Sequence, residues 1–556
     1  MLEQTKLLIE NIRSSVIGEG LLYHTWVGLR PMIYADYTAS GRSLTFIEDY
    51  IRDHVLPFYA NTHSESSATG RQSTLYREQA RDIIKKSLNA DENYAVIFSG
   101  SGATAAINKM INILGIKVPV ELNEKYKISD QIEENDRPVI FIGPYEHHSN
   151  ELTWRETIAD VVAIPLDDEG GIDIDFLQKS LIEYESRKLK IGSFSAASNV
   201  TGMMSDVPKI SKILHQHGAL SFWDYAAAAP YVPIDVKGAE NEDTSLDALF
   251  ISPHKFIGGP GTPGLLVVKK ELLKNSVPSL PGGGTVSYVS ANEHVYIPAG
   301  EHREEGGTPG IVEAIRAGLV FQLKDAVGAK IIKQLEHAMI VRAIERWSDN
   351  PNIQILGNLE APRTSIISFQ IMWKNKPLHF DFVVALLNDL FGIQVRGGCS
   401  CAGPYGHELL EVSPTFSHNI KEALERGNTI LKVGWVRLNF NYFISEETFE
   451  YLLSAIEIIA EHGWKMHNLY IYDGDRQIWR IKDNHKIENR DLNEISYDDG
   501  YISTSKPEMR GRCLPLSDYL EKAVAIMNMA KEAPRPEEHN YSKEIENLRW
   551  FSLPEK

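Results

Sequence analysis

The chain has 556 residues, of which 57 are Lys or Arg and 75 are Asp or Glu, so its formal net charge is −18. This acidic balance excludes a general nucleic-acid binder, which needs a basic footprint. A hydrophobic fraction of 43% is ordinary for a globular protein, and the length predicts two or three folding units.

Three features of the sequence indicate where in the cell the protein is expected. No run of 18 apolar residues occurs, so we expect no membrane span. The first ten residues lack the basic, apolar and small-residue order of a secretory signal. The three cysteines, Cys399, Cys401 and Cys513, make no disulfide framework. We therefore expect a cytoplasmic protein in a reducing compartment.

In chain order, the first predicted element is an amphipathic helix over residues 1 to about 25, followed by a turn-rich stretch from Gly18 to Arg30. The apolar face of this helix would be formed by Leu7, Leu8, Ile12 and Val16.

Between about Ile33 and Val268, short apolar runs alternate with helical segments. Such alternation is typical of a mostly parallel sheet with helices on both faces, which binds ligands beyond the carboxyl ends of its strands. The predicted strands are Ala95–Phe98, Pro138–Ile142, Val161–Ile164, Ile191–Ser195, Ala219–Trp223, Ala248–Ile251 and Leu265–Val268. The helices between them include Ala103–Leu114, Asp175–Tyr184 and Pro208–His217.

After the predicted sheet, the sequence pattern indicates a long helix, then a mixed region of strands and helices, and finally a polar segment. Two glycine-rich turns, Pro281–Thr285 and Gly306–Gly310, precede a long helix from about Gly310 to Trp347 that we expect to break near Gly328. Residues 350–465 mix strands and helices, which predicts a smaller α+β unit. The last part, from about residue 470, is predicted to be polar and irregular, apart from a helical stretch at Leu516–Lys531.

The clearest chemical signal is a lysine at the end of a predicted strand. The strand Ala248–Ile251 runs directly into Ser252-Pro-His-Lys255, and a glycine-rich turn at 258–264 follows. Desolvation in such a crowded loop lets a lysine lose its proton, and a neutral amine is a competent Schiff-base nucleophile. The glycines allow the backbone to pass close to a bulky ring. A surface lysine beside an ordinary turn is the usual alternative for a lone lysine.

Asp224 supplies the context that favours the catalytic interpretation. It follows the apolar strand Ala219–Trp223 and precedes Lys255 by about one βαβ unit, so the two side chains are expected at one edge of a parallel sheet. A buried carboxylate needs a cationic partner, and a protonated pyridine nitrogen supplies one that keeps the ring an electron sink. Taken alone, Asp224 fits a helix N-cap equally well.

Two further loops after strands fit the same pocket. Phe98–Asn108 has the order strand, small-residue loop and helix start, whose N–H groups attract a phosphate, with Thr104 as a hydroxyl donor. It is not a Walker A loop, because no Gly-Lys-Ser/Thr follows. His147 in Pro144–Asn150 is placed to stack on a conjugated ring. The competing interpretation is a metal site, but His147 and His148 are adjacent and no third ligand is visible, so we expect no metal.

In this order, the motifs resemble a fold-type I pyridoxal 5′-phosphate (PLP) enzyme of the class V aminotransferase family, over about residues 30–460. The chain is most similar to the group II cysteine desulfurases and selenocysteine lyases, and also resembles the N-terminal domain of molybdenum-cofactor sulfurases. The resemblance implies an α/β fold with a mostly parallel seven-stranded sheet. Together with the sequence pattern outside the matched region, it predicts four parts, namely an N-terminal helix and arm (1–30), a large PLP-binding domain (31–330), a small C-terminal α+β domain (331–468) and a polar extension (469–556).

The resemblance also implies roles for single residues. Ile33–Ser40 matches the opening strand that leads to the active site, and Lys255 matches the Schiff-base lysine. Thr308 matches a residue that reaches the phosphate of the neighbouring subunit, which implies a homodimer with shared active sites. The other matched cofactor-binding residues are Ala103, Thr104, Ser252 and His254 on the phosphate side, His147 stacked on the ring, Asn199 near the ring hydroxyl and substrate carboxylate, and Asp224 at the pyridine nitrogen.

One position departs from the family pattern. The family usually has Asp-x-Ala-Gln, in which the glutamine bonds the ring hydroxyl, and this chain has Ala227 at the matching position. The loss of one donor leaves the particular reaction open without removing the cofactor.

Three residues bear on the substrate. Arg437 resembles the arginine that pairs bidentately with an amino-acid α-carboxylate, and Arg396 is placed to assist it. Cys401 matches the nucleophilic cysteine of the desulfurases, and a thiolate, favoured by nearby arginines, attacks sulfur well. The alternatives are ordinary ion-paired arginines and a small buried cysteine.

These matches predict a cysteine desulfurase-like enzyme that converts L-cysteine to L-alanine. Lys255 would act as general base, and the persulfide on Cys401 would pass to a sulfur-acceptor protein. Other class V activities on an amino acid remain open: a C–S lyase, a selenocysteine lyase, an epimerase or an aminotransferase. A third interpretation is a catalytically idle partner in a sulfur-transfer complex, against which the intact Lys255, Asp224 and His147 set argues.

Overall fold

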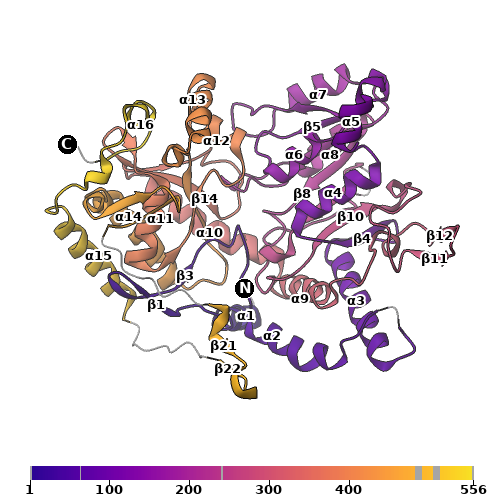
Figure 1. Ribbon diagram of the computed structural model, residues 1–556, viewed down its shortest axis with the longest axis horizontal. Helices are drawn as coiled ribbons and strands as arrows, with labels where there is room; N and C mark the ends of the chain where they lie inside the picture. Colours follow the sequence, from indigo (N-terminus) through magenta and orange to yellow (C-terminus); the bar gives the residue numbers. More distant parts are fainter. Residues whose placement is uncertain (1–2, 63, 240–241, 483–490, 505–513, 554–556) are drawn as a thin grey trace.

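The computed structural model describes residues 3–62, 64–239, 242–482, 491–504 and 514–553. Figure 1 shows two halves joined through the helix α10 (Ala329–Ser348): a large sheet with its helices, and a second α+β half drawn in orange. The predicted fold class, an α/β fold with a mostly parallel seven-stranded sheet, is confirmed.

The large sheet has the strand order β4-β10-β9-β8-β7-β5-β6. All neighbours are parallel except β10, which is antiparallel to both β4 and β9. All seven strands predicted from apolar runs are present, since strands covered on both faces are apolar throughout. Their bounds are β4 Tyr94–Ser99, β5 Val139–Ile142, β6 Asp160–Ala163, β7 Lys190–Ser195, β8 Leu220–Asp224, β9 Ala248–Ile251 and β10 Gly264–Lys269.

Alternate residues of these strands face two different cores. Ile97 packs with α4 and α6 on one face, and Val96 packs on the other face in the cluster that includes α3, α7, α8 and α9. The predicted helices between the strands are confirmed to within a residue or two, and the long helix breaks at Gly328, as predicted. The bounds are α3 Ala68–Ser87, α4 Gly102–Leu114, α6 Leu152–Arg155, α7 Ile174–Glu183, α8 Val207–Gln216 and α9 Ile311–Val327.

The N-terminal prediction was partly wrong. Helix α1 spans Glu3–Ser14 and does not continue to residue 25, because Gly18 and Gly20 adopt left-handed backbone angles. A hairpin of β1 (Leu22–Thr25) and β2 (Gly28–Pro31) follows. The buried face of α1 is made of Ile9 and Ile12, whereas Leu7 is exposed.

The second half is built on another sheet, with the order β13-β14-β18-β17 and β15 paired to β14. The short strand β3 (Ile33–Tyr34) pairs in parallel with β16 (Ile393–Gln394), so the beginning of the chain enters this half. The strands are β13 Ile353–Ile355, β14 Ile366–Trp373, β15 Lys376–Pro377, β17 Arg396–Gly398 and β18 Trp435–Asn439. The helices are α11 Phe380–Leu386, α12 Gly403–Leu409, α13 Pro414–Glu425 and α14 Glu446–His462.

The C-terminal residues contain more structure than their composition suggests. Strands β19 (Tyr470–Asp473) and β20 (Ile478–Ile481) form a hairpin, and helix α15 spans Leu516–Ala530 close to its predicted bounds. The prediction of an irregular segment was wrong for the hairpin, which contains Trp479. Trp479 and Phe551 are both buried in the core of the second half. Figure 1 shows α15 and α16 (Lys543–Leu548) along the outer edge of that half.

The remaining short elements lie at the periphery: α2 Thr45–Tyr50, α5 Val120–Tyr126, β11 Val286–Val289, β12 His294–Tyr296, β21 Ile495–Ser496 and β22 Ser503–Thr504. Within the described residues, no helix has the length and apolar character needed to cross a membrane.

Candidate active site

A pocket opens where the parallel strands of the large sheet end, and the second half contributes two arginines to its wall. The empty space in it, including the open mouth, is about 750 Å³. The predicted residues that line it are Ala103, Thr104, His147, Asn199, Asp224, Ser252, His254, Lys255, Arg396 and Arg437. Cys401 and Thr308 do not line it.

Lys255 ends the 3₁₀ turn Pro253–Lys255 that directly follows β9. Burial lowers the pKa of its amine to about 8, and the nearby Asp224 carboxylate works in the opposite direction. Arg437 and Arg396 add repulsion that also lowers this pKa. The neutral amine required of a covalent attachment point is therefore accessible near neutral pH.

Asp224 is the last residue of β8, the strand next to β9 in the sheet. Its carboxylate is buried, and Oδ1 accepts a hydrogen bond from the Ala226 N–H at 2.8 Å. Burial raises the pKa of Asp224, and the charge of Lys255 opposes the rise. Because the desolvation of Asp224 outweighs the effect of Lys255, a cationic ring nitrogen would stabilise this carboxylate further.

The start of α4 forms the cradle that the sequence predicts for a phosphate. Gly102 has a φ of 62°, and a Cβ there would come within 2.8 Å of the His254 ring and 2.9 Å of Ser252 Oγ. The Ala103 N–H donates to Ser252 Oγ at 2.9 Å, and Thr104 Oγ1 lies 2.6 Å from Ser149 Oγ. Backbone donors and hydroxyls at a helix N-terminus suit an anion.

His147 lies on the wall of the same pocket. Its Nδ1 accepts from the Ser149 N–H at 3.1 Å, and burial together with Lys255 lowers the pKa of the imidazole to about 3. A neutral ring is therefore available to stack on a conjugated ligand. Among the described residues, no group of three or more His, Cys, Asp or Glu side chains is arranged to hold a metal.

The carboxylate of Glu146 holds the loop that carries His147 against β7 through hydrogen bonds. The sequence analysis did not identify this residue. Glu146 accepts hydrogen bonds from the Ser195 N–H at 2.8 Å, the Ser195 hydroxyl at 2.6 Å and Asn150 Nδ2 at 2.6 Å. Burial raises the pKa of Glu146 to about 7. Its place beside His147 was the only sequence signal. Glu146 itself does not line the pocket. The lining residues that were not named as site residues from the sequence are Thr38, Ala39, Ser101, Gly102, Ser149, Ser195, Ala197 and Ala226.

The two arginines come from neighbouring strands of the second half, where Arg396 in β17 pairs directly with Arg437 in β18. Arg437 is buried; its Nη2 donates to Asp36 Oδ1 at 2.9 Å and its Nη1 to the Asn199 carbonyl at 3.0 Å. Asn199 Oδ1 is buried without a hydrogen-bond partner among the described residues, so a donor on a ligand would satisfy it.

Cys401 lies just behind the pocket wall, with its Sγ 3.5 Å from Arg396 Nη2. Its backbone φ is 58°, and that of Ser400 is 53°, an uncommon left-handed pair outside glycine. The loop is held by a hydrogen bond from the His148 N–H to the Cys401 carbonyl at 2.8 Å. Cys399 is exposed, and Cys513 lies outside the described residues.

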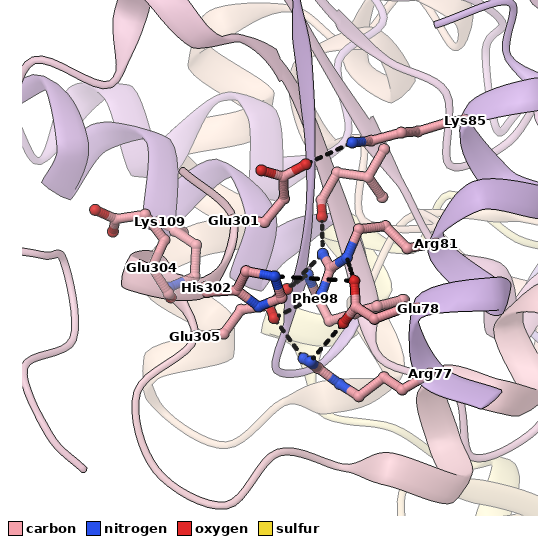
Figure 2. Close-up of polar contacts among 11 residues, drawn as sticks. Arg77, Glu78, Arg81, Lys85, Phe98, Lys109, Glu301, His302, Glu304 and Glu305 are labelled. Carbon is pink, nitrogen blue, oxygen red and sulfur yellow. Dashed lines mark hydrogen bonds and ion pairs between the residues drawn. The ribbon is translucent and has the colours of Figure 1, made fainter. Parts of the chain in front are cut away.

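Thr308 lies outside this pocket, with its Oγ1 3.4 Å from Asn61 Nδ2. Figure 2 shows how its loop is anchored: Glu305 lies between Arg77 and Arg81 of α3. Glu305 Oε1 also accepts from the Phe98 N–H of β4 at 2.7 Å. Such a buried ion pair holds the loop in position, because moving the loop away would leave a buried charge without its partner, which costs free energy.

Ala227 lines the pocket, as its motif position predicts, and its methyl group provides no hydrogen-bond donor. The site therefore lacks at this position the side-chain amide that the family usually has there.

The arrangement defines a class of protein before any comparison. A strand-end lysine, a buried carboxylate on the adjacent strand, a neutral histidine and an anion cradle fit PLP, and the fold around them is the fold-type I architecture of PLP enzymes.

The comparisons agree with this class. The family Aminotransferase class-V matches residues 33–416, so the chain belongs to that family, and it is a PLP-dependent enzyme. A probable cysteine desulfurase of Streptomyces coelicolor is 29% identical over 67% of this chain and 84% of its own length. One from Halalkalibacterium halodurans is 29% identical over 71% and 91%.

Solved structures show the same fold. The apo structure of a cysteine desulfurase from Thermococcus onnurineus covers 77% of this chain and 95% of its own, with a TM-score of 0.62 and 24% identity. A cysteine desulfurase of Escherichia coli covers 77% and 94%, with a TM-score of 0.60 and 21% identity.

Proposed function

We propose that the protein is a cysteine desulfurase, which converts L-cysteine to L-alanine and collects the sulfur as a persulfide on Cys401. The observation that carries this proposal is the 3.5 Å contact between Cys401 Sγ and Arg396, an arginine that lines the pocket with Lys255 and Asp224. The thiol thus lies next to the pocket that contains the proposed base. The names of the relatives give independent support.

Some pocket residues would bind the cofactor, and one, Lys255, would also transfer a proton. PLP, when bound, supplies an aldehyde that links to amines and a ring that withdraws electrons from the substrate Cα. Lys255 is its attachment point and the base that removes the Cα proton, for which a pKa near 8 is well suited. Asp224 would keep the ring nitrogen protonated, His147 would cover the ring, and Asn199 would bond near the ring hydroxyl.

The phosphate would be held by the start of α4, which includes Ala103 and Thr104, together with Ser252 and His254. Thr308 is proposed to reach the phosphate of the second subunit in a homodimer, which is consistent with its position outside its own pocket.

The substrate carboxylate binds to Arg437 with help from Arg396 and Asn199. The Cys401 sulfur, which lies 3.5 Å from Arg396 Nη2, attacks the substrate sulfur as a thiolate. A bond forms between the two sulfur atoms as the Cβ–S bond of the substrate breaks. The electron pair left on carbon takes up a proton, so alanine leaves. The sulfur then passes from Cys401 to an acceptor protein.

We also propose a cytoplasmic location, where thiols stay reduced. The proposed division of the chain is the arm 1–30, the PLP-binding domain 31–330, the α+β domain 331–468 and the extension 469–556.

The test compares two cysteines in one loop. In Cys401→Ser, alanine formation from L-cysteine should fall by at least about 100-fold, since removing a nucleophile has effects of that size or larger. The matched control Cys399→Ser changes an exposed thiol two residues away and should keep most activity. Alanine is measured by amino-acid analysis and the persulfide by intact mass. Unchanged alanine formation in Cys401→Ser would refute the proposal.

A second candidate is favoured by Ala227, because the missing donor changes the electronic environment of the ring. In that case the protein is another class V enzyme on an amino acid: a C–S lyase, a selenocysteine lyase, an epimerase or an aminotransferase. Product analysis with L-cysteine, L-selenocysteine and other amino acids separates these reactions by sulfide, selenide, racemised product or keto acid.

A further inference from the structure

The paired arginines of the pocket need anionic partners. Arg396 and Arg437 lie directly opposite each other on β17 and β18, and both line the pocket. Like charges that face each other across two strands repel, so anions are expected between or beside them. Arg396 contacts the sulfur of Cys401, and Arg437 forms a salt bridge with Asp36.

Asp36 is positioned by the backbone of the residue that precedes it. The preceding residue, Ala35, donates its N–H to the Gln394 carbonyl at 2.9 Å and accepts at its carbonyl from the Asn439 N–H at 3.1 Å. Asn439 is two residues beyond Arg437 in β18. This double attachment aims the Asp36 carboxylate at the guanidinium from the turn that follows β3.

The ion pair between Asp36 and Arg437 uses only one N–H group of the guanidinium, so a ligand could form a stronger contact. Asp36 bonds through one oxygen to one nitrogen, Nη2, at 2.9 Å. Arg437 Nε is buried and has no hydrogen-bond partner among the described residues. The arginine side chain is 2% exposed and that of Asp36 17%. A carboxylate free to orient itself would bond two N–H groups of the fork at once, which is the stronger geometry.

We propose that Asp36 is a built-in competitor of the substrate: it occupies Arg437 in the empty pocket and is displaced when an amino-acid α-carboxylate binds the guanidinium through two hydrogen bonds. The inference rests on the proposed function in that it takes an amino acid as the substrate. Asp36 neutralises a buried cation in the empty enzyme, and it weakens every ligand by the free energy of its own ion pair. Anions that bind through a single contact then fail to displace it, so the residue sets substrate specificity.

The test is Asp36→Asn in the holoenzyme, which keeps an acceptor oxygen for Nη2 and removes the charge. The dissociation constant of L-alanine, the probe used, should fall about tenfold, measured by calorimetric titration. The KM for L-cysteine should fall by a similar factor while kcat changes less than about threefold, because the variant alters binding and replaces neither Lys255 nor Cys401; Asp36 is only a minor contributor to the pKa of Lys255. Asp36→Ser serves as a second variant, with folding checked by circular dichroism.

The control is Glu19→Gln, which replaces the carboxyl group in a separate, smaller pocket beside Tyr34 and Tyr37 with a neutral amide. It should leave the dissociation constant of L-alanine unchanged. A purely structural role for Asp36 predicts the opposite sign, since a displaced Arg437 would bind L-alanine more weakly. An unchanged or higher dissociation constant in Asp36→Asn therefore overturns the proposal, as does the absence of any L-alanine binding in both enzymes.

The two proposals fail separately. L-alanine binding needs no thiol, so the Asp36 comparison can be repeated in the Cys401→Ser background. A wild-type enzyme that binds L-alanine but forms none from L-cysteine contradicts the desulfurase function, and the ratio of the two dissociation constants still decides the role of Asp36.

Discussion

Two buried lysines show how neighbours separate a reactive amine from a structural one. Burial lowers the pKa of Lys255 to about 8 and that of Lys324 to about 7. Lys324, however, donates to the Ala229 carbonyl at 2.6 Å and the Val232 carbonyl at 2.7 Å, so its amine is engaged in holding the backbone. Lys255 faces the pocket opposite Asp224. Geometry, rather than the pKa alone, identifies the base.

Lys255→Ala is expected to lose covalent cofactor attachment and to slow alanine formation by about 10²–10⁴-fold, the usual contribution of a general base. Attachment is measured as the mass added to the chain after borohydride reduction with PLP. Lys324→Met is the control: it should lower thermal stability and keep attachment. Equal attachment in Lys255→Ala and wild type would show that another amine holds the cofactor.

At the scale of elements, the start of α4 and the register of β17 with β18 determine what the pocket can bind. Residues alternate between the two faces of a strand, so a slip of one residue would turn either arginine away from the pocket. The pairing of Arg396 with Arg437 therefore places their two charges side by side on neighbouring strands. The end of β4 similarly fixes the first N–H groups of α4 beside Ser252.

Gly102→Ala tests the phosphate cradle. Its added Cβ would meet the His254 ring at 2.8 Å and Ser252 Oγ at 2.9 Å, so the dissociation constant of PLP should rise about tenfold or more. Gly115→Ala at the other end of α4 is the matched control, because Gly115 also has a positive φ, of 67°, but has nothing within 4 Å of the new Cβ. It should destabilise the fold and leave PLP affinity unchanged. Equal effects in both variants would contradict an anion cradle at Gly102.

On the scale of the whole molecule, the C-terminal residues complete the core of the second half. His467 stacks on Phe382 with ring centroids 4.1 Å apart, and His539 lies 6.3 Å from His467. Burial lowers the pKa of His467 to about 3 and that of His539 to about 4. Both are therefore neutral in the folded protein.

This arrangement predicts loss of stability in acid. The folded pKa of each histidine lies below its unfolded value of about 6.5, so the unfolded state binds more protons and stability falls as the pH drops below about 6.5. At pH 5 the loss is about 2 kcal/mol for each histidine. His467→Phe should therefore lose less stability than wild type between pH 7.5 and pH 5, measured by urea unfolding. His418→Gln, at an exposed position, should behave as wild type. The same loss in His467→Phe as in wild type would contradict this prediction.

The sequence by itself determined the large sheet and the part of the site that lies on it. Buried parallel strands are continuous apolar runs, and Asp224 and Lys255 each follow one, so local pattern was enough to bring them to the same edge. The predicted βαβ unit between them was wrong, since the described residues that connect β8 to β9 form turns and no helix. The resemblance to the family added the neighbouring roles of His147, Asn199 and the phosphate loop.

Only the tertiary structure decided contacts between distant segments. Asp36 and Arg437 are 401 residues apart, and neither carries a local signal for the other. The same holds for the Cys401 loop, which is fixed by His148, and for Trp479 and Phe551, whose polar surroundings in sequence hide their burial. The physical reason is that hydrophobic period and turn chemistry act over a few residues, whereas ion pairs and shared cores depend on how separate elements pack together.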